Sequence, residues 1–261
     1  MKKILKRILI RTFLMTFTLF VAVISLLLNP QVLFAQKAVY RDFTIYSNNK
    51  IPDNYKPTID YAIEVIKTSE IYEQDQQLNI FLCDGTIYND IDTKLFGPAM
   101  ARCVDDNILL KVPADFTKNV LVGWNSKRNL KKTIAHEAMH FYQMKKYGAM
   151  KFNPLNHPPT WKLDGYPEYI ANQKDLKSSD YDLKKSIKKL IEFEKTGEYW
   201  IETEPGQLDP LVYYKGRVMI EYLIDVKRLT YSEILNKDVT EDKVITEMTS
   251  WYNKQKEGFS Q

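Results

Sequence analysis

Two of the chain's three histidines stand four residues apart in the segment HEAMH, residues 136–140, with Glu137 between them. On an α-helix, positions i and i+4 lie on one face, about 6 Å apart along the axis, so both imidazoles can face one metal ion. Glu137 would lie about 100° around that helix, where its carboxylate can take a proton from a water molecule beside the metal. Zinc would lower the pKa of that water toward about 7 and polarise a carbonyl group. The segment therefore predicts two zinc ligands, His136 and His140, and a general base, Glu137.

The alternative interpretation is a pair of structural histidines on an ordinary helix, because three fixed residues recur by chance in unrelated chains. Two features favour the metal site. Histidine is otherwise nearly absent from the chain, and the flanking residues Ile134, Ala138 and Phe141 suit a buried helix.

A catalytic zinc ion needs a third protein ligand and an open coordination position. The candidates lie in NHPPTWKLDGYPEYIAN, residues 156–172, and are Asp164, Glu168 and His157. Asp164 is followed by a glycine and then by Pro167, so it also fits the N-cap of a helix. In that case Glu168, one turn further on, would bind the metal. His157 stands beside two prolines and fits a loop.

The segment WKLDGYPEY, residues 161–169, taken together with HEAMH, resembles the gluzincin metallopeptidases, whose second helix carries a W-x-x-E-G-x-x-E-Y segment. The resemblance implies that Asp164, at the position of the family's glutamate, is the third ligand. It also implies that Glu168 orients a ligating histidine, with metal binding by Glu168 as the alternative. The aspartate is a departure from the family pattern. Its side chain is one methylene shorter, so the two helices must approach more closely.

A second segment, VYYKGRVMIEYL at residues 212–223, resembles one in the aminopeptidase branch of the gluzincins. There a tyrosine stabilises the oxyanion of the tetrahedral intermediate, and the matching residue here is Tyr213, with Tyr214 as the fallback. The branch's G-x-M-E-N segment, whose glutamate holds the substrate's amino group, has no counterpart, because GPAMARC at residues 97–103 contains no glutamate. The chain is therefore not predicted to be an aminopeptidase, and the strand NILLKV is expected to line the cleft and pair with an extended peptide.

The elements that must position these residues alternate in the first half of the chain. Hydrophobic patterns predict a helix that begins at Pro57 and strands at residues 42–46, 78–83 and 107–112. A turn-rich stretch separates the last two strands. The second half is expected to be helical throughout, with the histidine helix ending before Gly148 and later helices at residues 182–195, 212–226 and 241–255.

These patterns predict an α+β fold in which a small mixed sheet packs on the helix that carries HEAMH, followed by a helical C-terminal subdomain. The resemblance implies that this is a zincin-like metallopeptidase domain. We expect one domain at residues 36–261, with its sheet-containing part at 36–128 and its helical part, which holds the zinc site, at 129–261.

Residues 1–35 differ in character from the rest. They contain five basic and no acidic residues, and a long apolar run precedes Ala35. This pattern predicts a secretory signal peptide cleaved after Ala35, or an uncleaved anchor that crosses the membrane through residues 12–28. In both cases the remainder is extracytoplasmic. The net charge of +4 disappears without this segment, so composition does not indicate a nucleic-acid partner.

Export also bears on Cys83 and Cys103, the only cysteines of the chain. Outside the cytosol two cysteines can pair into a disulfide, whereas two buried free thiols are the alternative.

The sequence predicts an exported zinc-dependent metallopeptidase that hydrolyses peptide bonds of a peptide or protein substrate. The alternative function is a catalytically weak or inactive extracytoplasmic binding protein on a gluzincin scaffold, for which the aspartate at position 164 is the main support.

Overall fold

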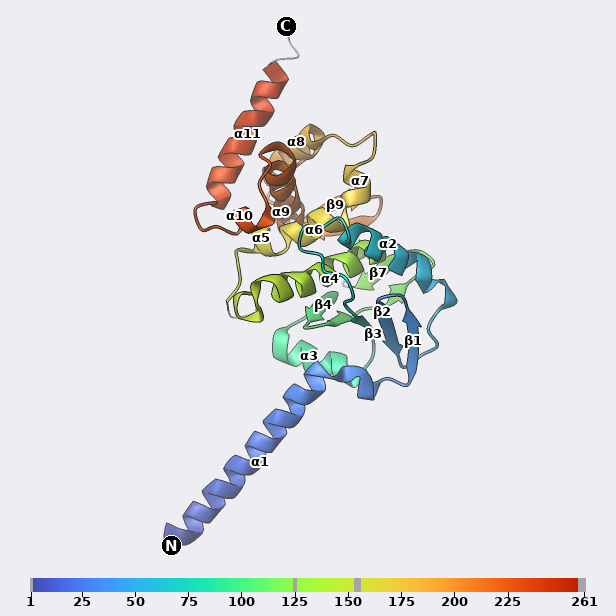
Figure 1. Ribbon diagram of the computed structural model, residues 1–261, viewed down its shortest axis with the longest axis vertical. Helices are drawn as coiled ribbons and strands as arrows, with labels where there is room; N and C mark the ends of the chain where they lie inside the picture. Colours follow the sequence, from blue (N-terminus) through green and yellow to red (C-terminus); the bar gives the residue numbers. More distant parts are fainter. Residues whose placement is uncertain (1, 124–125, 153–155, 258–261) are drawn as a thin grey trace.

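The computed structural model describes residues 2–123, 126–152 and 156–257, and its mixture of helices and small sheets confirms the predicted α+β class (Figure 1). Five strands form a mixed sheet in the order β1-β2-β3-β5-β4. The inner pairs β2–β3 and β3–β5 are parallel, and the outer pairs β1–β2 and β4–β5 are antiparallel. The strands are β1 (Gln36–Tyr40), β2 (Phe43–Ser47), β3 (Leu78–Leu82), β4 (Ala101–Val104) and β5 (Asn107–Leu110).

Alternate residues of the central strands enter two separate hydrophobic clusters, as the two faces of a strand require. Ile80 and Ile108 belong to the main core, on the face covered by α2 (Lys56–Ile66) and α4 (Leu130–Tyr147). Phe81 and Leu109 belong to a smaller cluster on the opposite face, beneath α3 (Ile87–Phe96). The histidine helix α4 therefore packs on only one of the two faces of the sheet.

A helix and a strand occupy the stretch between β3 and β5 that was predicted to be rich in turns. Helix α3 begins at Thr86, whose side chain accepts a hydrogen bond from the backbone of Asn89, and β4 follows it. Strand β4 pairs with the outer side of β5 and so forms the edge of the sheet. The expectation that NILLKV pairs with an extended peptide is therefore wrong, because β5 already has β3 on one side and β4 on the other.

The second half is mostly helical, but it is not helical throughout. A hairpin of β9 (Trp200–Glu204) and β10 (Gln207–Pro210) interrupts it and packs against β8. A three-stranded sheet of β6 (Ala114–Asp115), β7 (Val120–Gly123) and β8 (Ser126–Asn129) leads into α4. The remaining helices are α5 (Thr160–Leu163), α6 (Gly165–Ala171), α7 (Gln173–Leu176), α8 (Leu183–Glu194), α9 (Leu211–Glu221, continued by a π-helical turn at Tyr222–Val226), α10 (Tyr231–Ile234) and α11 (Glu241–Glu257).

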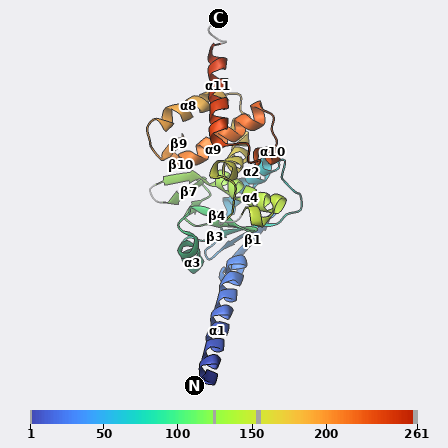
Figure 2. The same ribbon diagram turned by 90° about the vertical axis from the view of Figure 1, so that its left-hand side faces the viewer.

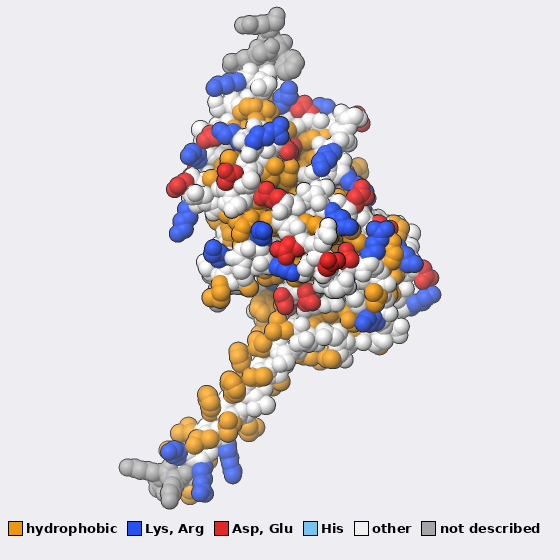
Figure 3. Space-filling model, in the orientation of Figure 1, with side chains coloured by type: hydrophobic (Ala, Val, Ile, Leu, Met, Phe, Trp, Pro, Cys, Tyr) orange, Lys and Arg blue, Asp and Glu red, His pale blue; other side chains and the backbone are white. Residues whose placement is uncertain are grey.

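The N-terminal helix α1 (Lys2–Leu28) projects from the domain on the side of α3, as both ribbon views show (Figures 1 and 2). Its side chains are largely apolar along the rod, with basic residues toward the free end (Figure 3). Among the described residues it is the one helix long and apolar enough, by length and composition, to cross a membrane, over Ile4–Leu28.

The structure also corrects the disulfide considered for Cys83 and Cys103, since both cysteines are free. Strand β5 separates their strands, because Cys103 in β4 pairs with Ile108 and Ile108 pairs with Ile80 of β3. Cys83 is three residues further along and packs in the small cluster, whereas Cys103 packs against the main core on the other face.

Helices α6 and α9 cross at a pair of glycines. A Cβ atom built on Gly165 would lie 2.7 Å from the carbonyl carbon and oxygen of Gly216. One built on Gly216 would lie 3.0 Å from the Gly165 Cα and 3.1 Å from the Trp161 oxygen. The backbones therefore touch at the residue that directly follows Asp164.

We predict that Gly165→Ala lowers the free energy of unfolding by about 1–3 kcal/mol, because the new methyl group overpacks backbone that cannot yield. The same substitution at Gly216 should act in the same direction. Urea-induced unfolding of the two variants and the parent measures the effect. Variants as stable as the parent would show that the helices do not cross this closely.

Candidate metal centre

Helix α4 brings His136 and His140 to one face and buries most of the segment around them. The helix begins after Asn129, whose side chain accepts a hydrogen bond from the backbone of Lys132, and it ends before Gly148, which has a positive φ of 89°. Ala135 and Ala138 are fully buried, so α4 packs tightly against its surroundings at the level of the histidines. The Nε2 atoms of the two imidazoles lie 3.1 Å apart.

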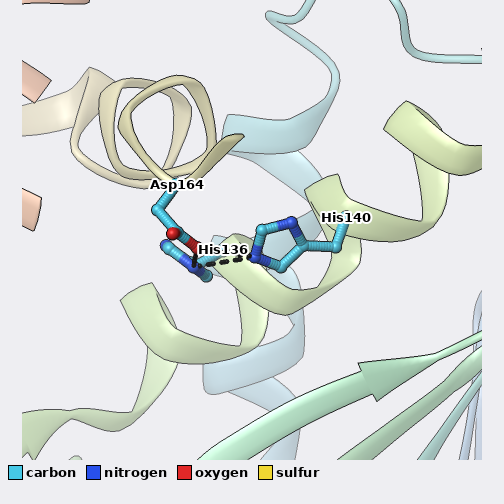
Figure 4. Close-up of side chains that lie close together, drawn as sticks. All are labelled: His136, His140 and Asp164. Atoms are coloured by element: carbon cyan, nitrogen blue, oxygen red, sulfur yellow. Dashed lines mark hydrogen bonds and ion pairs between the residues drawn. The ribbon is translucent and has the colours of Figure 1, made fainter. Parts of the chain in front are cut away.

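Asp164 reaches the same point from the turn between α5 and α6 (Figure 4). It occupies the residue before α6, as an N-cap would, but its side chain makes no capping hydrogen bond. Instead its Oδ1 lies 3.3 Å from His140 Nε2 and 3.6 Å from His136 Nε2. The carboxylate is therefore aimed at the histidines rather than at the start of its own helix.

These three atoms form a triangle with edges of 3.1, 3.3 and 3.6 Å. Ligands about 2.0–2.1 Å from a tetrahedral ion are separated by about 3.3 Å, so one ion can contact all three atoms with little movement. His136, His140 and Asp164 are the described His, Cys, Asp and Glu residues that converge in this way. The group can hold a metal ion.

Glu168 lies on the other side of the His136 ring. Its Oε1 is 3.0 Å from His136 Nδ1, in a direction too oblique for a regular hydrogen bond, and 2.7 Å from Arg128 Nη2, which donates to it. Arg128 Nε also donates to Asp209 Oδ1 at 2.8 Å. Glu168 thus contacts the ring nitrogen opposite the candidate metal position, where a carboxylate orients a ligating histidine.

Gln143 orients the His140 ring, as Glu168 orients the His136 ring. Its Nε2 donates to the backbone oxygen of Leu163 at 2.8 Å, so its Oε1 faces His140 Nδ1, also at 2.8 Å. An amide oxygen only accepts, hence Nδ1 carries a proton, and Nε2 is the ring nitrogen that faces the candidate metal position. Gln143 also contacts the hydroxyl of Tyr231, which donates to the backbone oxygen of Lys162.

The electrostatics of the site are those of a cation-binding pocket. Burial lowers the pKa of His136, but Glu168 and Asp164 outweigh it and raise that pKa to about 10. Burial raises the pKa of Glu168, but His136 and Arg128 bring it down to about 2. The two histidines likewise hold the pKa of Asp164 well below its usual range against the effect of burial. The negative potential that retains a proton on His136 would equally attract a metal ion.

A cleft of about 600 Å³ opens over the histidines. Glu137 and Tyr213 line it together with all four residues of β4 and apolar side chains that include Phe96, Met144 and Phe152. The Tyr213 ring lies 5.7 Å from the His136 ring, and the Arg128 guanidinium lies 5.3 Å from the centre of the Tyr213 ring. Burial, and then Asp164, raise the pKa of Tyr213, so its hydroxyl stays protonated.

The other candidates of the sequence lie apart from the triangle. His157 is exposed at the mouth of the cleft, with its Nδ1 2.7 Å from the backbone oxygen of Pro158. The Tyr214 hydroxyl donates to the backbone oxygen of Ser186 at 3.3 Å and faces α8. Neither belongs to the group that can hold a metal ion.

Arg128, Gln143 and Tyr231 are contacts of the site that sequence reasoning missed. Gln143 follows His140 by three residues, so helical spacing places it on the same side of α4 and could have identified it. Arg128 and Tyr231 carry no such local signal, because they meet the site through β8 and α10.

Comparisons with known proteins found no similar family model, curated protein or solved structure. The resemblance to the gluzincins therefore stays a prediction, supported only by the residues and geometry of this chain.

We predict that the metal-free protein loses a few kcal/mol of stability between pH 7 and pH 10. The folded pKa of His136, about 10, exceeds its unfolded value near 6.5, so its contribution is complete below pH 6.5 and is lost as the pH rises through 10. Thermal unfolding across this range measures the loss. In Glu168→Gln the loss should be smaller, because the main charge that raises the pKa of His136 is gone. Identical profiles would contradict this account of the electrostatics.

We also predict that Gln143→Leu weakens zinc binding about 10- to 100-fold, because the His140 ring loses the acceptor that fixes its tautomer. Gln173→Leu is the matched control, since Gln173 is a buried glutamine whose amide donates to the backbone oxygen of Tyr169 and which does not belong to the group that can hold a metal ion. Competition with a zinc chelator measures the affinities. Equal losses of zinc affinity in both variants would show that the effect comes from replacing a buried glutamine and not from losing the contact with His140.

Proposed function

We propose that the protein is a zinc-dependent metallopeptidase of gluzincin type whose catalytic domain lies outside the cytoplasm. One observation carries the proposal, namely the triangle of His136 Nε2, His140 Nε2 and Asp164 Oδ1, with Glu137 in the same cleft. The apolar N-terminal helix supports export.

Zinc is the metal that this donor set suits best. Two imidazole nitrogens and one carboxylate oxygen, with edges near 3.3 Å, match the three-ligand sites of catalytic zinc. Calcium and magnesium prefer six or more oxygen ligands, which this site does not offer among the described residues. Bound there, zinc would supply Lewis acidity to a water molecule and to the carbonyl group of the scissile bond.

The chain's own residues would supply the proton transfer and the charge stabilisation. Glu137 lies next to the ligands on the cleft side of α4, where its carboxylate can accept a proton from the attacking water and pass it to the leaving amine. The Tyr213 hydroxyl, which keeps its proton, would donate to the oxyanion that forms on the carbonyl.

The cleft favours an extended peptide as substrate. Strand β4 forms one wall, and its outer edge has no partner strand among the described residues. An extended peptide can hydrogen-bond to such an edge as an additional strand, while Phe96, Met144 and Phe152 offer apolar contacts for its side chains. This supports hydrolysis of peptides with apolar residues near the scissile bond.

The alternative of an inactive binding protein drew its support from the aspartate at position 164. The distances from Asp164 Oδ1 to both histidines favour the catalytic proposal instead, because the shorter side chain reaches the candidate metal position.

The test measures zinc content and peptide cleavage in the full-length protein and in Glu137→Gln. We expect about one zinc ion per chain in both, and at least a 100-fold lower cleavage rate in the variant, because only the base is lost. Glu192→Gln, on the exposed face of α8, is the matched control and should keep full activity. A Glu137→Gln variant as active as the parent, or a parent without zinc, would refute the proposal.

A further inference from the structure

The last turn of α1 is part of the domain. Leu27 is only 5% exposed and packs in the small cluster with Phe81, Tyr88 and Leu109, on the face of the sheet opposite α4. The Tyr88 hydroxyl donates to the Leu27 backbone oxygen at 2.9 Å. The Asn107 side chain donates to the next backbone oxygen, that of Leu28, at 3.1 Å. Apolar contacts and hydrogen bonds together fix the end of the helix.

The chain that follows α1 stays on the domain instead of forming a loose linker. Residues 30–33 form a short 3₁₀-helix, and the Phe34 ring lies 5.1 Å from the ring of Phe81. The backbone nitrogen of Ala35 donates to Asn48 Oδ1 at 3.1 Å, and β1 begins at the next residue. Removal of residues 1–35 would therefore uncover apolar surface on β3, β5 and α3.

Residues 4–22 of α1 are exposed, with no cover among the described residues. Its exposed apolar side chains include Phe13, Met15 and Leu19, and the helix is long and apolar enough over Ile4–Leu28 to cross a membrane. Lys6, Arg7 and Arg11 lie in the first half of α1, far along the helix from the turn that contacts the domain, and Figure 3 shows basic side chains gathered toward that end. Such a charge distribution places the free end in the cytoplasm.

The residues before Ala35 also disfavour cleavage of the chain at that point. Signal cleavage requires small residues in an A-x-A-like pattern. Ala35 meets this requirement, but Leu33, two residues before it, is large and packs against the small cluster.

We propose that α1 remains in the mature protein as a membrane anchor whose outer end is built into the domain. The bilayer covers the apolar residues that follow Arg11, with the three basic side chains at its cytoplasmic surface. Residues 27–35 hold the domain rigidly at the opposite membrane surface. Helix α3 lies beside this junction (Figures 1 and 2), and its apolar side chains Ile87 and Leu95 are exposed. The proposal does not depend on the catalytic function.

The first test expresses the full chain with a C-terminal tag and measures its location and intact mass. We expect the mass to include residues 1–35 and the protein to remain with the membranes after a carbonate wash. A product that begins at Gln36 and is released in soluble form would overturn the proposal.

The second test compares Leu27→Ala with Leu19→Ala in the full-length protein in detergent. The two changes remove the same atoms from one helix, but Leu19 is 66% exposed. We expect Leu27→Ala to lower the melting temperature by about 5 °C or more and Leu19→Ala to leave it unchanged. Equal melting temperatures in the two variants would show that α1 is not built into the domain.

Discussion

The structure depends on a concentration of charge in its interior. Carboxylates from Glu137, Asp164 and Glu168 gather around two imidazoles, and among the described residues only Arg128 opposes them directly there. Burying charge is costly unless an opposite charge or good hydrogen bonds compensate it. Without a metal, a proton on His136 supplies part of this compensation. A divalent cation would supply more, because Arg128 is already shared between Glu168 and Asp209 and does not neutralise Glu137 and Asp164 as well.

The surrounding elements serve to hold this arrangement. The sheet and α2 support α4 from one side, and the crossing of Gly165 over Gly216 sets the start of α6 beside Asp164. Gln143 then connects α4 to the backbone just before Asp164. Its amide donates to the backbone oxygen of Leu163 and to the hydroxyl of Tyr231, and that hydroxyl donates to the backbone oxygen of Lys162. The ligands therefore come from two elements whose relative position is fixed by backbone contact and buried hydrogen bonds, which is the condition for a site organised before it binds.

The part of this arrangement that sequence reasoning could predict is the local part. The spacing of His136, Glu137 and His140 implies their common face, and the strands and helices with strong apolar patterns occur where they were expected. Asp164 was one of three candidate third ligands, and only the resemblance of its segment to a family motif favoured it over Glu168 and His157. The rest depends on contacts between distant segments, which carry no local signal. The strand order, which places β5 between the segments that hold the two cysteines, could not be predicted. Strand β4 could not be predicted either, because four residues are too few to show a pattern. The polar helix α3, which begins after a turn containing Gly85, was also missed.

X-ray absorption at the zinc edge, on full-length protein loaded with one equivalent of zinc, tests the central claim most directly. The account predicts a four-coordinate shell of nitrogen and oxygen at about 2.0–2.1 Å, with the outer scattering of two imidazoles. A sulfur neighbour at about 2.3 Å, a six-coordinate oxygen shell or a single imidazole would contradict the assignment of His136, His140 and Asp164 as the ligands.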